Sequence, residues 1–118
     1  MLVFVYGTLK RGERNHHFLK RGQYLGDWQT PPCFAFFDLG AYPGLYRPGN
    51  TAVQGELYRV SPAIMAQLDW LEEVPRVYRR EWLVTPWGRA VVYVLQRRPR
   101  RARTLEAGRW PDGYRREV

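Results

Sequence analysis

The chain begins with the run Val3-Phe4-Val5-Tyr6-Gly7-Thr8-Leu9-Lys10-Arg11-Gly12, in which apolar residues stop at a glycine and polar and basic residues follow. This pattern predicts a buried strand that leads into a tight loop. Because Gly7 has no Cβ, neighbouring N–H groups could point at the oxygen atoms of a small ligand. An ordinary junction between a strand and a turn has the same pattern, so the rest of the chain must decide between the two interpretations.

The composition indicates one small folded domain. The chain has 118 residues, 45% hydrophobic and 15% aromatic, so we expect a single domain over residues 1–118. No window approaches the roughly 20 apolar residues of a membrane span. The apolar start at Leu2–Tyr6 is too short for the core of a signal peptide. We therefore expect a cytoplasmic protein without a membrane partner.

The cysteine and histidine content predicts no metal site. A single cysteine, Cys33, excludes an internal disulfide and a zinc site built from several cysteines. It lies in the apolar run Cys33–Phe37 with no histidine nearby in sequence, which favours a packing role over a nucleophilic one. His16 and His17 lack further partners at metal-ligand spacing.

The charge is strongly positive, with a formal net charge of +8. This value invites the hypothesis of nucleic-acid binding. However, the sequence has no recognition helix and no aromatic stacking platform of the usual kinds, so nucleic acid is not the favoured partner. The densest basic run is Arg97–Arg103, and we interpret about residues 98–118 as a basic C-terminal tail.

The order of predicted elements favours an α+β fold. Apolar and aromatic runs bounded by turn-forming residues predict strands at residues 3–6, 23–29, 33–39, 53–60, 78–85 and 89–96. Residues 12–22 suggest a short helical turn, and 40–45 and 47–50 suggest loops. Too few helices are present for a doubly wound parallel sheet. We expect a small mixed β-barrel or sheet with one main flanking helix and a short N-terminal helix.

The main helix is predicted to begin after Ser61, because serine is a favoured N-cap and Pro62 suits the first helical position. On a helical wheel its apolar residues share one face, and Glu72 lies at the edge of that face. Glu73 points toward solvent. A carboxyl group partly buried among apolar side chains has a raised pKa, which suits general acid–base catalysis at neutral pH.

A structural role for Glu72 remains an alternative at this point. The chain is rich in arginine, and Arg76 and Arg79 are close enough in sequence to form an ion pair with Glu72. Glu56, in the predicted strand at 53–60, is the alternative carboxylate. It shares a strand face with Gln54 and Tyr58.

Taken together, the motifs resemble the gamma-glutamylcyclotransferase-like family, also called AIG2-like, whose bacterial members have a similar size. Any one of the matching segments is a weak signal, but their common order along nearly the whole chain is a strong one. The segments are Val5–Gly12 with Asn15-His16, Tyr42-Pro43, Val53–Tyr58, Leu68–Glu72, Tyr78–Arg80 and Gly108–Trp110.

This resemblance implies a small barrel with flanking helices and a site without a cofactor or metal. Family enzymes release 5-oxoproline from gamma-glutamyl amines or amino acids when the α-amine of the substrate attacks its own γ-carbonyl. The expected partner is therefore a small gamma-glutamyl compound. The family's catalytic glutamate falls on Glu72, and Tyr78 is expected beside the site. The loop that holds the substrate with backbone groups falls on Tyr6, Gly7, Thr8 and Leu9.

Two positions depart from the family pattern. The family usually has glycine after the catalytic glutamate, where this chain has Glu73, and Arg109 replaces the acidic residue of the closing Gly-Asp-Trp. A helix that ends at Glu73 lacks the usual left-handed glycine. Arg11 is a candidate countercharge for the substrate. Two other functions stay open, a non-catalytic binding module of the same fold and a nucleic-acid-binding domain. The oligomeric state is not predicted.

Overall fold

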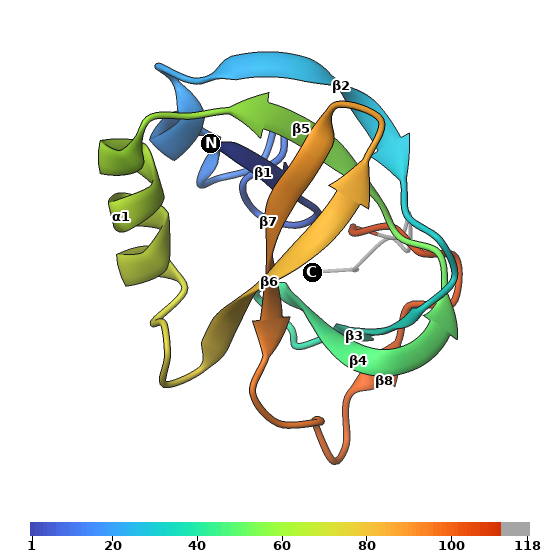
Figure 1. The fold of residues 1–118 in the computed structure, drawn as a ribbon. Coiled ribbons are helices and arrows are strands. Elements are labelled where there is room, and N and C mark those ends of the chain that lie inside the picture. Colours follow the sequence, from blue (N-terminus) through green and yellow to red (C-terminus); the bar gives the residue numbers. More distant parts are fainter. Residues whose placement is uncertain (112–118) are drawn as a thin grey trace.

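The computed structural model describes residues 1–111, which form two β-sheets and one main helix (Figure 1). The five-stranded sheet has the order β2-β5-β1-β7-β6, and the three-stranded sheet has the order β4-β3-β8. The helices are α1 (Pro62–Leu71) and the short 3-10 helix η1 (His16–Leu19). The strands are β1 (Leu2–Val5), β2 (Gln23–Gln29), β3 (Phe34–Asp38), β4 (Pro43–Thr51), β5 (Gln54–Arg59), β6 (Tyr78–Thr85), β7 (Gly88–Leu95) and β8 (Arg103–Thr104).

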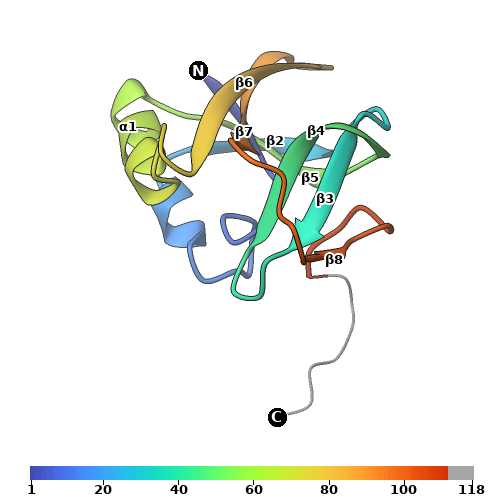
Figure 2. The same cartoon turned by 90° about the horizontal axis from the view of Figure 1, so that it is seen from below.

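Strand β1 lies at the centre of the larger sheet, antiparallel to β5 and parallel to β7. Its apolar run is continuous because both of its faces are covered. Phe4 belongs to the core shared with the three-stranded sheet, whereas Val3 and Val5 belong to the core shared with α1. Figure 2 shows α1 and the β3–β4 pair on different sides of this central strand. The predicted first strand is therefore the element on which both cores are built.

Helix α1 begins as predicted from its cap. The Ser61 hydroxyl accepts a hydrogen bond from the N–H of Ile64 at 3.2 Å, and Pro62 occupies the first turn. Met65 and Leu68 are completely buried against the larger sheet. The helix therefore docks through the predicted apolar face, and this fixes the direction in which its C-terminal residues point. None of the helices in residues 1–111 is long and apolar enough to cross a membrane.

The strands of the described residues divide into two sheets and do not close into one barrel. The predicted α+β class is confirmed in its sheet form, and the barrel implied by the family resemblance is not present. The prediction of loops at 40–45 and 47–50 is wrong for 43–45, which pair with β3, and for 47–50, which belong to β4 where its register with β3 shifts. Pro43, Pro48 and Gly49 suggested loops, but β4 lies at the edge of its sheet, where proline is tolerated.

The predicted basic tail from about residue 98 is wrong for residues 103–110. Strand β8 pairs with β3, and Leu105 and Trp110 are buried in the core between the sheets. The Gly108 N–H donates to the Leu105 carbonyl, and the Gly108 carbonyl accepts from the N–H of Gln54. This segment thus packs over the start of β5, at Gln54. The remainder of the predicted tail, 112–118, lies outside the described residues.

Candidate active site

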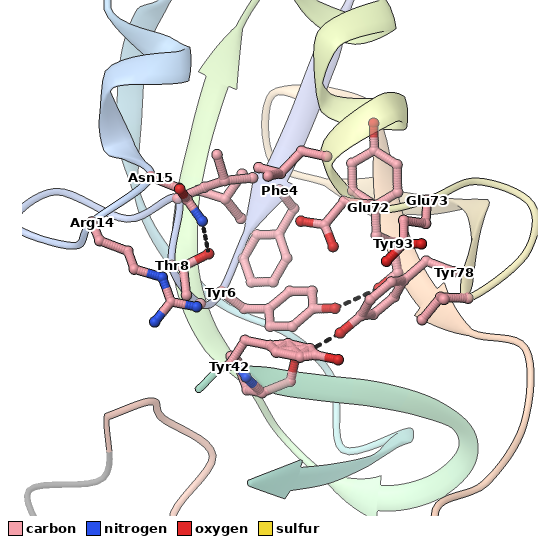
Figure 3. Close-up of a pocket in the computed structure, with 16 residues that line it drawn as sticks. Phe4, Tyr6, Thr8, Arg14, Asn15, Tyr42, Glu72, Glu73, Tyr78 and Tyr93 are labelled. Carbon is pink, nitrogen blue, oxygen red and sulfur yellow. Dashed lines mark hydrogen bonds between the residues drawn. The ribbon is translucent and has the colours of Figure 1, made fainter. Parts of the chain in front are cut away.

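A cavity of about 300 Å³ lies between the loop after β1, the end of α1 and the start of β6 (Figure 3). The structure brings all of the predicted site residues to its wall, although they come from three separate parts of the chain. These residues are Tyr6, Gly7, Thr8, Leu9, Glu72 and Tyr78.

Glu72 and Glu73 both line the cavity, but the end of α1 gives them different backbone conformations and different partners. Glu72 is the C-cap, and Glu73 has a left-handed backbone with φ of 50°. The N–H of Glu73 donates to the Trp70 carbonyl at 3.1 Å, and the N–H of Val74 donates to the Asp69 carbonyl at 3.0 Å. These are the two hydrogen bonds of a Schellman motif, in which the left-handed residue is usually glycine. Glu73 therefore takes a backbone conformation that glycine adopts without strain, and ends the helix there at a cost of about 1 kcal/mol.

Among the described residues, the carboxyl group of Glu72 has no partner that neutralises it. Arg76 forms an ion pair with Glu73, and the Arg79 Nε donates to Glu81 Oε2 at 2.8 Å. Within residues 1–111 no hydrogen bond or ion pair engages the Glu72 carboxylate. Burial in the cavity wall raises the pKa of Glu72 to about 7. The structural alternative of an Arg76 or Arg79 pair is thus wrong, and Glu72 can both accept and donate a proton near neutral pH.

Three tyrosines form the wall around Glu72, and each hydroxyl donates to a fixed acceptor. Tyr6 donates to the Tyr93 carbonyl at 2.7 Å and Tyr78 to the Pro43 carbonyl at 2.9 Å. The Tyr93 hydroxyl donates to Asp69 Oδ1 at 2.8 Å. Burial, with the nearby Glu72 as a smaller cause, raises the pKa of both Tyr6 and Tyr78 above the usual tyrosine value. These phenols therefore remain neutral and shape the cavity instead of competing with Glu72 as bases.

In the loop after β1, the carbonyl groups of Gly7, Thr8 and Leu9 are each bonded to a later residue. The Gly7 carbonyl accepts from the N–H of Lys10 at 3.1 Å, and Leu9 carbonyl lies 2.9 Å from Nδ1 of His16. Asn15 bonds Thr8 twice, backbone to backbone at 2.9 Å and through its side-chain Nδ2 to Oγ1 at 3.0 Å. The loop is therefore held in one conformation.

The N–H groups of the same loop are left available. No acceptor within the described part of the chain engages the backbone N–H of Gly7, Thr8 or Leu9. A Cβ on Gly7 would lie 2.6 Å from Cγ of Pro43, so glycine is required here by close packing against β4. The loop thus presents unsatisfied donors at the wall of a small cavity, an arrangement that suits anionic oxygen atoms.

Glu56 and Arg11 do not reach this cavity. Glu56 is buried, and its Oε1 accepts from the Arg11 N–H at 3.0 Å and from the Tyr58 hydroxyl at 2.8 Å. Its Oε2 forms an ion pair with Arg11 Nε at 3.3 Å. The alternative carboxylate and the candidate countercharge are therefore bound to each other, and together they attach the loop to β5.

Several residues at the cavity were not among the predicted site residues. Asn15 and Tyr42 belong to motifs of the family resemblance, so their positions carried a signal. Arg14 and Tyr93 carried none, since one is a lone arginine among many and the other is an aromatic residue in an ordinary strand. Within residues 1–111, no three His, Cys, Asp or Glu side chains are grouped so that they could hold a metal ion.

Known proteins share the sequence pattern and the fold of this chain. A family model described as "Gamma-glutamyl cyclotransferase, AIG2-like" matches residues 3–112, nearly the whole chain. The chain belongs to this family. A Vibrio cholerae protein, whose name assigns it provisionally to the gamma-glutamylcyclotransferases, is 49% identical over 109 residues, 92% of this chain and 94% of that protein.

Two further proteins are similar to this chain, one in structure and sequence and one in sequence. The solution structure of the Escherichia coli protein ytfP superposes with a TM-score of 0.77 at 40% identity, over 95% of this chain and 97% of that one. A Niallia circulans protein named "Gamma-L-glutamyl-butirosin B gamma-glutamyl cyclotransferase" is 40% identical over 72 residues. That match covers 60% of this chain and 45% of the Niallia protein.

Proposed function

We propose that this protein is a gamma-glutamylcyclotransferase that releases 5-oxoproline from a small gamma-glutamyl compound, with Glu72 as general acid and base. The observation that carries the proposal is the unpaired Glu72 carboxyl group, whose pKa is about 7, in a cavity opposite a loop with free N–H groups. Membership of the family supports the reaction type.

In the first step, the Glu72 carboxylate accepts a proton from the substrate's α-ammonium group. The freed amine then attacks the γ-carbonyl carbon and closes a five-membered ring. In the second step, the protonated Glu72 donates this proton to the former amide nitrogen, and the bond between that nitrogen and the γ-carbon breaks. The ring nitrogen then loses its remaining extra proton to Glu72, which passes this proton to the released amine. The products are 5-oxoproline and an ammonium ion, and Glu72 returns to its starting carboxylate form. A carboxyl pKa near 7 suits both transfers.

The rest of the cavity folds the substrate and holds its negative charges. The attack is intramolecular, so most of the task is to bring the α-amine to the γ-carbonyl. The N–H groups of Gly7, Thr8 and Leu9 hold the α-carboxylate, which every gamma-glutamyl substrate carries. The neutral phenols of Tyr6 and Tyr78 limit the space in which the chain of the substrate can extend.

The test is 5-oxoproline release from a panel of gamma-glutamyl amino acids and amines by wild type, Glu72→Gln and Glu73→Gln. Glu72→Gln should lower kcat by about 10²- to 10⁴-fold, the usual contribution of a general acid–base group. Glu73→Gln is the matched control, because Glu73 is an adjacent acid that pairs with Arg76, and it should lose less than threefold.

Two outcomes would contradict the proposal. Release that survives in Glu72→Gln would assign the proton transfer to another group. Binding of a gamma-glutamyl compound without any release would instead indicate a binding module of the same fold.

A further inference from the structure

Arg14 is the one cation among the described residues that line the cavity. Its side chain is exposed, and within residues 1–111 it forms no ion pair with any acid. Other arginines of the described residues form ion pairs with Asp or Glu side chains. These are Arg11, Arg47, Arg76, Arg79, Arg80 and Arg103. The guanidinium group of Arg14 is therefore available to a ligand of the cavity.

Arg14 and Glu72 approach the cavity from different sides. Figure 3 shows Arg14 beside Thr8 and Tyr42 at the loop after β1, whereas Glu72 comes from the end of α1. The rings of Phe4 and Tyr6 lie between them. The cavity thus has a proton-transfer side and a separate cationic side.

The proposed reaction leaves one part of the substrate without a partner. The scissile amide must lie at Glu72, since its nitrogen receives the proton of that group. The α-carboxylate takes the N–H groups of Gly7–Leu9. What remains is the substituent on the leaving amine, and Arg14 is the cavity residue with an unused charge.

We infer that Arg14 makes the site selective for leaving amines that carry a carboxylate. The inference rests on the proposed function and names its substrate class: gamma-glutamyl amino acids are preferred to gamma-glutamyl derivatives of neutral or cationic amines. A guanidinium group binds a carboxylate through two parallel N–H···O hydrogen bonds and repels an ammonium group. Because the Arg14 side chain is exposed, solvent and salt weaken the contact, so the preference is moderate.

The experiment compares gamma-glutamyl-alanine with gamma-glutamyl-alaninamide, in which a neutral carboxamide replaces the carboxylate of the leaving amine. Wild type should show a kcat/KM about tenfold higher for the acid than for the amide, the effect of one charge-assisted contact. Arg14→Gln should bring this ratio close to 1. The ratio compares two substrates of the same protein preparation. A loss of folded protein therefore lowers both kcat/KM values equally and leaves the ratio unchanged. Arg21→Gln, which removes an equally exposed arginine that does not line the cavity, should keep the wild-type ratio.

Three results would overturn the inference or the function beneath it. A wild-type ratio near 1 overturns the selectivity. Equal losses on both compounds in Arg14→Gln also overturn it, because Arg14 would then hold the shared α-carboxylate. If neither compound yields 5-oxoproline, the proposed function fails and the two dissociation constants decide on Arg14. If wild type binds the acid about tenfold more tightly than the amide, and Arg14→Gln removes this difference, the carboxylate contact is supported. Equal dissociation constants of the two compounds in wild type overturn it.

Discussion

Glu72 and Glu56 are two carboxylates withdrawn from solvent in one small protein, and they differ in their partners. Glu56 receives hydrogen bonds from the Arg11 backbone and the Tyr58 hydroxyl and forms an ion pair with the Arg11 side chain. Glu72 receives none within residues 1–111, and burial raises its pKa to about 7. Burial alone thus does not determine what a carboxylate does.

The difference separates a structural role from a chemical one. A buried carboxylate whose oxygens accept hydrogen bonds holds elements together, as Glu56 holds the β1 loop to β5. A carboxylate with no partner is destabilised in its charged form, so it gains and loses a proton near neutral pH. The same fold contains both types: Glu56 bonds Arg11 of the loop after β1, and Glu72 lies in the wall of the cavity that this loop lines.

The largest expected effect on stability comes from Glu56→Gln. The amide of glutamine adds a donor where Arg11 and Tyr58 already donate, and the ion pair is lost. We expect a loss of about 2 kcal/mol in the free energy of unfolding, typical for hydrogen bonds to a buried charged group. Urea unfolding at pH 8 measures it. In Glu72→Gln, the matched variant, stability should be unchanged or higher, and an equal loss there would contradict the contrast between the two carboxylates.

A pH dependence of stability should follow from Glu72. Its pKa is about 7 in the folded protein and near 4.5 in the unfolded chain, so between these values the folded state binds more protons. Stability contributed by the protonated group is therefore present at low pH and is lost as pH rises from about 4.5 through 7. We expect a change on the order of 1–2 kcal/mol, after allowance for the solvent that still reaches the partly buried side chain.

Urea unfolding of wild type and Glu72→Gln across pH 4.5–8 measures how much Glu72 contributes to the pH dependence of the unfolding free energy. The difference between the two proteins should change with pH in the stated direction. A difference that stays constant over this range would mean that Glu72 titrates normally and that its environment does not disfavour the charge.

The smallest effect is expected from Glu73→Gly. Glycine adopts the left-handed backbone at this position without strain, which should stabilise the fold by about 0.5–1 kcal/mol. The lost ion pair with Arg76 is exposed and offsets only a small part of the gain. Glu73→Ala, which also loses the ion pair but cannot relieve the strain, is the control. Equal thermal midpoints for the two variants would exclude backbone strain as the cause.

Local sequence patterns predicted the larger part of the fold. Periodicity and turn chemistry within a few residues predicted the first strand, the strand at Gln23–Gln29 and the cap of α1 at Ser61. They also predicted the strands at 78–85 and 89–96. Strand β4 and strand β8 did not, because they exist through pairing with β3. Their own residues, rich in proline, glycine and arginine, favour loops.

The sequence by itself determined that Glu72 follows the buried face of the helix. Helical geometry at 100° per residue places Glu72 at the edge of the face that carries Leu68. Glu73, with its left-handed backbone, lies outside this geometry. The wheel, however, says nothing about what surrounds the carboxylate.

Only the tertiary structure decided that Glu72 is unpaired and that Arg14 shares its cavity. In a chain with 19 basic residues and 11 acidic ones, many ion pairs are compatible with the sequence. The actual pairs depend on distances between residues that lie far apart along the chain. Packing of α1, the β1 loop and β6 sets these distances, and so it selects Arg11 for Glu56 and leaves Glu72 free to exchange a proton.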